Sequence, residues 1–212
     1  MNQLVNGLSG DFLPRFLGGM VVNFEIAAIA LALGLALGAV LALGRLAGGV
    51  VAGVSVSLVS LMRAAPTFVV MFFLLNALPR DATLFGRPFG LSGVMTVALS
   101  LVPYSAAYVG DAAFDALRHL RAGTTHGAIL FLPNVTRAFF VLVMSSSAGA
   151  AIGVTEAITV ILRESEHLPE LGDRLVLFAL GIVLFGIPLQ AAFAVIGMIQ
   201  RRVARAAAAR AM

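Results

Sequence analysis

Long, predominantly apolar runs constrain this chain more than any other feature of its sequence. One run, GMVVNFEIAAIALALGLALGAVLAL, covers residues 19–43, and others cover residues 56–78, 91–113, 138–162 and 175–199. Each holds the roughly 20 residues that a helix needs to cross the hydrocarbon core of a bilayer. The runs lack the alternating hydrophobicity of a lipid-facing barrel. We therefore predict an all-α integral membrane protein with five transmembrane helices.

Composition agrees with lipid as the main solvent of the chain. Hydrophobic residues make up 60% of it, charged residues 11%, and the mean hydropathy is +1.03. So few charges cannot cover a water-exposed surface. The first run has no small-residue cleavage site followed by a polar segment, so we expect a permanent span rather than a signal peptide. No low-complexity linker interrupts the chain, which predicts a single transmembrane domain over residues 1–212.

The basic residues and the missing residue types exclude several classes of function. All 14 basic residues are arginines, and the chain has neither lysine nor cysteine. A phosphate-binding P-loop needs its lysine, so any ATP hydrolysis is expected on another subunit. Without cysteine there are no disulfides, thiol nucleophiles or thiolate metal ligands. The histidines lie in separate segments and no serine has a histidine and aspartate pattern around it, so we expect neither a metal site nor an enzyme.

The distribution of the arginines predicts the orientation of the spans. With the N-terminus outside, nine arginines lie in or near inner segments and five lie in outer segments. The inner set is Arg45, Arg63, Arg118, Arg121, Arg137, Arg201, Arg202, Arg205 and Arg210, and the outer set is Arg15, Arg80, Arg87, Arg163 and Arg174. Cytoplasmic segments carry the excess of basic residues, so the N-terminus is expected outside and the C-terminus inside. This explains the basic residues better than nucleic-acid binding does.

Charged residues inside the runs are costly in lipid and need a reason. Glu25 and Glu156 are expected at about the same depth, where they could meet a ligand ammonium group, pair with loop arginines or reach water singly. Asp111 and Asp115 lie one turn apart near the inner end of the third span, and an ion pair with Arg118 or Arg63 is the default interpretation. Arg63 could reach the inner headgroups or face a gate.

Backbone features add two expectations. Pro66 lacks an N–H and disfavours helix at the preceding residue, so a kink is expected in the second span. The stretch MSSSAGAAIGVTE, residues 144–156, is rich in small and hydroxyl residues, which indicates close packing or a wet path. Gly34 and Gly38 have the spacing that permits close contact between helices, although this pattern arises easily by chance in a chain with 22 glycines.

Several segments together resemble the five-span permease subunits of amino-acid ABC importers. FLGGMVVNFEIAAIALALGLALGAVLALGRL is similar to the first span of that family. VSLMRAAPTFVVMFFLLNALP, ALSLVPYSAAYVGDAAFDAL and SSSAGAAIGVTEAI are similar to three further segments of it. The matching positions are Arg63, Pro66, Thr67, Tyr108, Ser146, Ser147 and Glu156, with Asp111 in place of a glutamate. The order and spacing agree from about residue 17 to residue 200, which implies the fold of a type I ABC importer permease.

The resemblance implies a function in a complex at the bacterial inner membrane. Such permeases pair with a second permease, receive amino acids from a periplasmic binding protein and are driven by two ATPases that bind ATP and Mg²⁺. The matched residues, together with Glu25, are then candidates for the substrate pathway and its gate. If Glu25 and Glu156 both face the path, a polar or cationic amino acid is favoured electrostatically. This chain itself is expected to bind no cofactor.

The family's coupling segment is degenerate in this chain. Residues 114–137 include LRHLRAGTTHGAILFLPN, where the ending of the family motif survives but roughly a dozen preceding residues are missing. The candidate contacts with an ATPase are Arg118, His119, Arg121, Gly123, Leu132, Pro133 and Asn134. So short a loop can hardly supply a full coupling helix. We therefore expect weak or altered contact with an ATPase and a second, non-identical permease that carries the main coupling.

Two alternatives to a transport subunit remain open. The shortened loop is compatible with a non-transporting scaffold or regulatory subunit derived from such a permease. A channel or proton-coupled carrier would use Glu25, Asp111 and Glu156 as relays, but no selectivity-filter pattern or inverted repeat is visible in the sequence.

Overall fold

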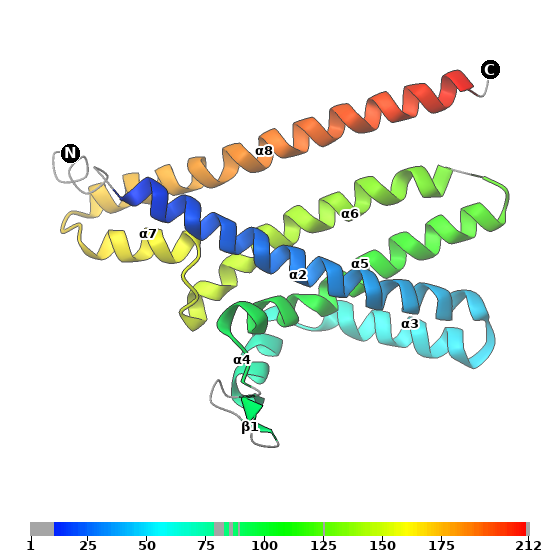
Figure 1. Ribbon diagram of the computed structural model, residues 1–212, viewed down its shortest axis with the longest axis horizontal. Helices are drawn as coiled ribbons and strands as arrows, with labels where there is room; N and C mark the ends of the chain where they lie inside the picture. The colour runs from blue at the N-terminus through cyan, green and yellow to red at the C-terminus, as the bar shows by residue number, and fades with distance from the viewer. Residues whose placement is uncertain (1–10, 79–82, 85–86, 89, 125, 211–212) are drawn as a thin grey trace. The chain divides into compact units, whose positions relative to one another are not determined.

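The computed structural model describes residues 11–78, 83–84, 87–88, 90–124 and 126–210 of the 212-residue chain. Long helices joined by short connections make up nearly all of these ranges (Figure 1). The helices are α2 (Phe12–Ala47), α3 (Gly49–Ala64), α4 (Thr67–Ala77), α5 (Gly93–Arg121), α6 (His126–Ser145), the 3₁₀ helix η1 (Ser146–Ile152), α7 (Ala157–Glu166) and α8 (Leu171–Arg210). Two short strands, β1 (Thr83–Leu84) and β2 (Arg87–Pro88), pair antiparallel. The predicted all-α fold is confirmed.

The described helices provide four to five candidate membrane spans. Four segments are long and apolar enough to cross a bilayer, namely Phe12–Ala47, Gly93–Arg121, Phe131–Ile152 and Leu171–Met198. The consecutive helices α3 and α4 add a fifth if they are taken together as one broken span. The prediction of a membrane protein with about five spans therefore agrees with the length and composition of the helices.

The region predicted as a single span at 138–162 is broken in the structure. The α-helix begins upstream at His126 and ends at Ser145, η1 follows, and the backbone leaves the helix before α7 begins at Ala157. Gly153 has a φ of +79°, a left-handed conformation that helices do not contain. Serine, threonine and glycine also have low helix propensity. The row of small residues between 144 and 156 thus interrupts the span.

Local sequence signals place the ends of other helices. The Ser92 Oγ accepts a hydrogen bond of 3.2 Å from the Met95 N–H at the start of α5, an N-cap that satisfies one of the free donors of the first turn. Gly48 and Gly49 have φ values of +78° and +57° between α2 and α3. The chain reverses direction at this pair (Figure 1), in a conformation that costs other residues roughly 1–2 kcal/mol.

The described residues divide into two compact units. One consists of Ile26–Ala148, and the other combines Met1–Glu25 with Gly149–Met212. The single transmembrane domain over residues 1–212 stays a prediction.

In the unit Ile26–Ala148, α5 is the central helix and packs against α3, α4 and α6. Small residues bring α2 onto the same helix. A Cβ atom at Gly38 would lie 2.8 Å from the Gly110 nitrogen and 2.9 Å from the Ala106 oxygen, so the two backbones are in direct contact. A Cβ atom at Gly34 would overlap the Ser105 side chain. The glycine spacing therefore marks a helix contact, as the pattern of small residues in membrane helices permits.

In the other unit, the start of α2 packs against α7 and the first half of α8. Aromatic and aliphatic side chains spaced four residues apart on one face of α2 provide half of the contact. The buried cluster consists of Phe12, Phe16, Met20, Ala157, Val160, Ile161, Leu168 and Leu177. The Phe12 and Phe16 rings stack with centroids 5.9 Å apart. This cluster holds the short helix α7 beside the two long helices.

Candidate functional site

The predicted kink at Pro66 is present and is sharp. The helices α3 and α4 meet at an angle of 93°, with a break at Ala65 and Pro66. Pro66 is the N-cap of α4 and has a ψ of 123°, an extended conformation. Thr67, the first residue of α4, is half-buried. The proline thus divides the second predicted span into two helices of different direction.

The predicted ion pair of Asp111 is confirmed, and a second arginine joins it. Arg63, at the end of α3, pairs with Asp111 Oδ2, while Arg45, near the end of α2, donates to Oδ1 at 2.7 Å. The guanidinium carbon of Arg45 also lies 4.0 Å from the centroid of the Phe114 ring, a cation–π geometry. One carboxylate on α5 therefore binds the ends of two other helices through two positive charges.

The other members of this charged region differ in exposure. The Arg63 side chain is 62% exposed and that of Arg45 only 19%. Asp115 and Arg118 are exposed, and the described part of the chain provides no ion pair for either. The expected alternative partner of Asp111, Arg118, is thus replaced by Arg45.

Glu156 lies in a buried network rather than on an open path. The residue is 0% exposed and is the N-cap of α7. Its Oε1 accepts from the Thr159 N–H at 2.8 Å, and its Oε2 accepts from the Ile158 N–H at 2.9 Å and from the Asn23 Nδ2 at 3.1 Å. The Asn23 Oδ1 in turn accepts from the Ala157 N–H at 3.2 Å.

This network explains how a carboxylate is accommodated without a cation. The first N–H groups of a helix are free donors, and the helix dipole places a partial positive charge there. Glu156 and Asn23 together accept from the N–H groups of residues 157–159. The carboxylate therefore accepts hydrogen bonds from N–H groups of its own helix and from the Asn23 side chain on α2, and the residue is not exposed to solvent.

Glu25 has a different environment from Glu156. It lies on α2 and is exposed, two residues after the buried Asn23. The two carboxylates predicted at one depth therefore do not share an accessible surface. Tyr108 on α5 is half-buried and stacks on Tyr104, with ring centroids 6.1 Å apart.

The serine pair of the fourth family-like segment lies where α6 passes into η1. Ser146 is fully buried, and its Oγ donates to the Val143 carbonyl at 2.7 Å. Ser147 is half-buried. Ser146 therefore has a hydrogen bond within its own helix turn, while Ser147 is the more accessible of the two.

The predicted coupling loop, residues 114–137, is a helical hairpin. The helix α5 continues to Arg121, a turn follows, and α6 begins at His126, so the described part of this segment has no separate helix lying across the turn. The two helices run side by side (Figure 1). Gly123 has a φ of +77° in the turn. The expectation of a turn rather than a full coupling helix agrees with this geometry.

Hydrogen bonds hold the turn to the neighbouring helices. The Thr124 Oγ1 donates to the His119 carbonyl at 3.1 Å and lies 3.2 Å from the His119 Nδ1. Arg121 is exposed, and its Nη1 donates to the Leu46 carbonyl at the end of α2 at 3.4 Å. Arg121 thus satisfies a carbonyl that the helix end leaves free.

The surviving end of the coupling motif forms part of α6. Leu132 is 65% exposed, whereas Pro133 and Asn134 are half-buried and lie within the helix. The exposed Leu132 therefore lies within α6, in the segment Phe131–Ile152 that is apolar enough to cross a membrane, and not in the turn itself.

Sequence reasoning missed two residues of these networks, Asn23 and Arg45. Asn23 lies in the first apolar run, where a buried amide is costly without hydrogen bonds. This cost could have identified Asn23 as a residue with a buried hydrogen-bond partner. Arg45 follows the same run and was assigned only to membrane orientation. No group of three or more histidine, cysteine, aspartate or glutamate side chains that could hold a metal ion occurs in the described residues.

Comparison with known proteins gives one informative similarity. A scan against protein-family models and a search of curated proteins found no match. A search of solved structures found a chain described as the crystal structure of an amino acid ABC transporter with histidines. The two chains align with a TM-score of 0.65 and 18% sequence identity, over 92% of this chain and 100% of that chain. The likeness confirms the fold that the sequence resemblance implied, that of an ABC importer permease.

Proposed function

We propose that this chain is a permease subunit of an ATP-driven ABC importer for amino acids. The observation that carries the proposal is the shared fold over 92% of the chain and the whole length of the transporter chain. The four family-like segments occur in the same order along the sequence. The substrate would cross the membrane by alternating access, in which the permease pair exposes its binding site to each side in turn.

The energy for transport would come from other subunits. The chain has no lysine and therefore no P-loop, so ATP and Mg²⁺ would bind to a separate pair of ATPases. A periplasmic binding protein would deliver the amino acid. The arginine distribution supports a bacterial inner-membrane protein with its N-terminus in the periplasm and its C-terminus in the cytoplasm.

Within the chain, the bend and the charge cluster are the strongest candidates for a gate. The bend at Pro66 divides a span, and Arg63 next to it is paired with Asp111. We assign Arg63, Pro66, Thr67, Tyr108 and Asp111 to the gate region on this basis. Ser147 would line the path more readily than the buried Ser146.

The identity of the amino acid is supported less directly. A preference for polar or cationic solutes was expected from two accessible carboxylates. Because Glu156 is buried and hydrogen-bonded while Glu25 is exposed, the electrostatic support for a cationic solute rests on Glu25 alone.

Coupling to the ATPases would depend on a second, non-identical permease. The hairpin of α5 and α6 offers Arg118, His119 and Arg121 close to its turn, and the described residues there form no helix across its end. Weak contact through this turn, with the main contact on the second permease, fits the geometry.

Purification of the tagged chain from its native membrane tests the proposal. Mass spectrometry of the purified complex is expected to identify an ABC ATPase, a second permease and, under mild conditions, a periplasmic binding protein. A chain recovered repeatedly from intact membranes without any ATPase or second permease would contradict the proposal.

A non-transporting scaffold subunit is the second candidate, and the short turn between α5 and α6 favours it. Uptake of amino acids in a strain that lacks the chromosomal copy separates the two functions. Asp111→Asn and Ser147→Val variants are expected to impair uptake if the chain lines the path. Unchanged uptake by both variants, with the complex intact, would favour the scaffold.

A further inference from the structure

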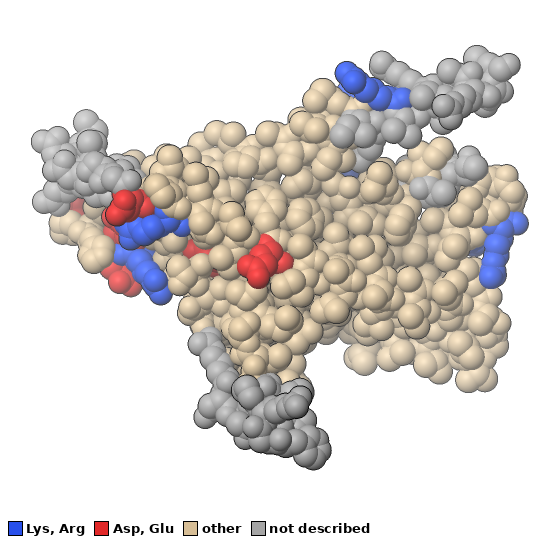
Figure 2. Space-filling model, in the orientation of Figure 1, with Lys and Arg blue, Asp and Glu red and all other residues tan. Residues whose placement is uncertain are grey.

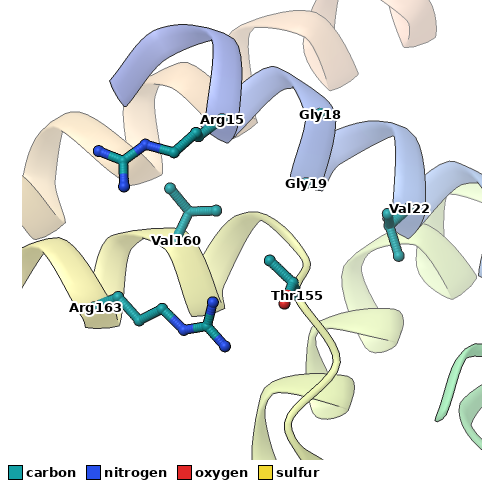
Figure 3. A pocket seen from close by; sticks show the side chains of 7 residues that line it. All are labelled: Arg15, Gly18, Gly19, Val22, Thr155, Val160 and Arg163. Atoms are coloured by element: carbon teal, nitrogen blue, oxygen red, sulfur yellow. The ribbon is translucent and has the colours of Figure 1, made fainter. Parts of the chain in front are cut away.

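A small pocket lies between the start of α2 and the helix α7, outside the gate region described above. Its volume is about 240 Å³, and Figure 3 shows its walls from close by. The lining residues are Arg15, Gly18, Gly19, Val22, Thr155, Val160 and Arg163. All of them belong to the same compact unit.

Two adjacent glycines create the pocket. A Cβ atom at Gly19 would lie 2.6 Å from the Ala157 nitrogen, so α2 rests directly on the first residue of α7. A Cβ atom at Gly18 would meet no heavy atom within 4 Å, so the absent side chain leaves open space there. The close contact at one glycine and the space at the next bring the two helices together around a hollow.

The pocket carries a net positive charge. Arg15 donates from Nη2 to the Glu164 Oε2 at 3.0 Å and from Nε to the Asp11 carbonyl at 3.2 Å. Arg163, on the opposite wall, has no ion pair with any described residue. Figure 3 shows the two guanidinium groups on either side of Val160. Two arginines and one glutamate leave one unit of positive charge uncompensated at this site.

Charged side chains are rare on the rest of the visible surface (Figure 2). Uncharged residues cover most of the visible face of the described chain, and acidic and basic side chains gather near the start of α2 and the end of α7 (Figure 2). Arg163 is thus a cation at the wall of a hollow, with no ion-pair partner among the described residues, in a chain that has few charges.

The side chains that line the pocket indicate the chemical class of its ligand. A guanidinium group binds a carboxylate through two parallel hydrogen bonds, which makes arginine the preferred residue for such anions. Val22 and Val160 supply apolar surface for a short hydrocarbon segment, and Thr155 supplies a hydroxyl group. Pockets for larger organic ligands measure about 300–1,000 Å³, so the occupant of this one is small.

We propose that this pocket binds the carboxylate of a small free organic acid, a class that includes amino acids, with Arg163 and Arg15 as the anion-binding residues. The oxygens of the ligand lie between the guanidinium groups and its hydrocarbon part lies against the valines. Phosphate oxygens share this hydrogen-bonding chemistry, and the lipid headgroups of a bacterial membrane carry them, so the test separates the two sources. The site does not depend on transport, since binding is a property of the chain alone.

Calorimetric titration of the full chain in nanodiscs of phosphatidylcholine tests the site with propionate and propionamide. The two probes have nearly the same shape and differ in the charged carboxylate. Propionate is expected to bind in the millimolar range and propionamide at least tenfold more weakly. This pair tests the site in the unchanged chain, so the result does not depend on the folding of any variant.

Substitutions then locate the binding site. Arg163→Gln removes the charge and is expected to weaken propionate binding at least tenfold, since the bidentate pair is lost. Arg163→Lys keeps the charge without the fork geometry and is expected to retain part of the affinity. Arg202→Gln, at an exposed arginine of α8 that does not line the pocket, is the matched control and is expected to change nothing.

Three results would overturn the proposal. The first is equal binding of propionate and propionamide, or no binding of either. The second is tighter binding of inorganic phosphate than of propionate. The third is retention of phosphatidylglycerol by the chain in an Arg163-dependent manner, with no propionate binding in phosphatidylcholine discs. The last two would assign the pocket to phosphate oxygens, free or in a headgroup.

Discussion

Glu156 and Asp111 are both carboxylates at the ends of apolar segments, and the two compact units satisfy them in different ways. Glu156 is 0% exposed and accepts hydrogen bonds from the N–H groups of its own helix and from Asn23. Asp111 is 38% exposed and is bound by Arg45 and Arg63. Uncharged hydrogen-bond donors thus hold the buried carboxylate, and two arginines hold the accessible one through ion pairs.

The difference has a physical basis and a functional consequence. Ion pairs deep in a low-dielectric region cost desolvation of both charges, whereas helix N-terminal donors are already present and would otherwise be unsatisfied. The Glu156 network is therefore suited to a fixed part of the scaffold. The pairs of Asp111, with one partner 62% exposed, can open and close at lower cost, which suits a part that moves.

The strongest test of this comparison is the removal of the Glu156 carboxylate. Glu156→Ala leaves the N–H groups of Ile158 and Thr159 and the Asn23 amide without their acceptor. We expect a loss of about 3 kcal/mol in the free energy of unfolding, from the lost cap and the unsatisfied buried donors. Thermal unfolding in detergent, followed by circular dichroism, measures it. Glu156→Gln keeps one acceptor oxygen and is expected to lose about half as much; an equal loss from both would contradict the network.

The helix contact in the other unit provides the next effect. Gly38→Ala places a methyl group 2.8 Å from the Gly110 nitrogen, so the backbones of α2 and α5 must separate. We expect a loss of about 1–3 kcal/mol, as for other overpacked positions. Gly53→Ala on α3 is the control because its Cβ meets no atom within 4 Å, and helix propensity predicts a gain of about 0.5–1 kcal/mol there. Equal unfolding temperatures for the two variants would exclude the close contact.

The turn between α5 and α6 gives a smaller effect. Gly123 has a φ of +77°, so Gly123→Ala is expected to cost about 1 kcal/mol of stability in the same unfolding assay. Gly123→Asn serves as the control, since asparagine tolerates this conformation better. A stabilising effect of alanine would show that the turn does not have this geometry.

The smallest expected change in stability belongs to Asp111. Asp111→Asn removes the ion pairs with Arg45 and Arg63, and we expect a loss of at most about 1 kcal/mol because the groups are partly exposed and screened. Amino-acid uptake is expected to fall strongly, although the free energy of unfolding changes little. Asp115→Asn, one turn further along α5 and exposed, should leave both unchanged. A large loss of stability in Asp111→Asn with normal uptake per folded molecule would assign this cluster to the scaffold.

Residue patterns predict the spans and the bend, since both depend on local chemistry. Apolar runs identify the membrane helices, and the missing N–H of Pro66 gives the break between α3 and α4. The pair of Glu156 and Asn23 joins residues 133 positions apart, and no local pattern indicates such a contact. Arg45 was assigned to orientation alone because nothing in the sequence places it beside Asp111.

The break in the fourth predicted span could be predicted from the sequence only in part. The small residues between 144 and 156 indicate close packing or a wet path, and in the structure they end the helix. The low helix propensity of the serines, glycines and threonine in this stretch carried that information, but tertiary packing often overrides propensity. The buried cap at Glu156 decides where the next helix begins.

We propose above that this chain is a permease subunit whose coupling segment is reduced to a turn, so that transport depends on a second permease. ATP-driven amino-acid uptake in proteoliposomes tests it most directly, with the chain and its ATPase reconstituted in the presence and absence of the second permease. Uptake is expected only when the second permease is present. Uptake driven by this chain and the ATPase alone, or no uptake from the full set with its binding protein, would contradict it.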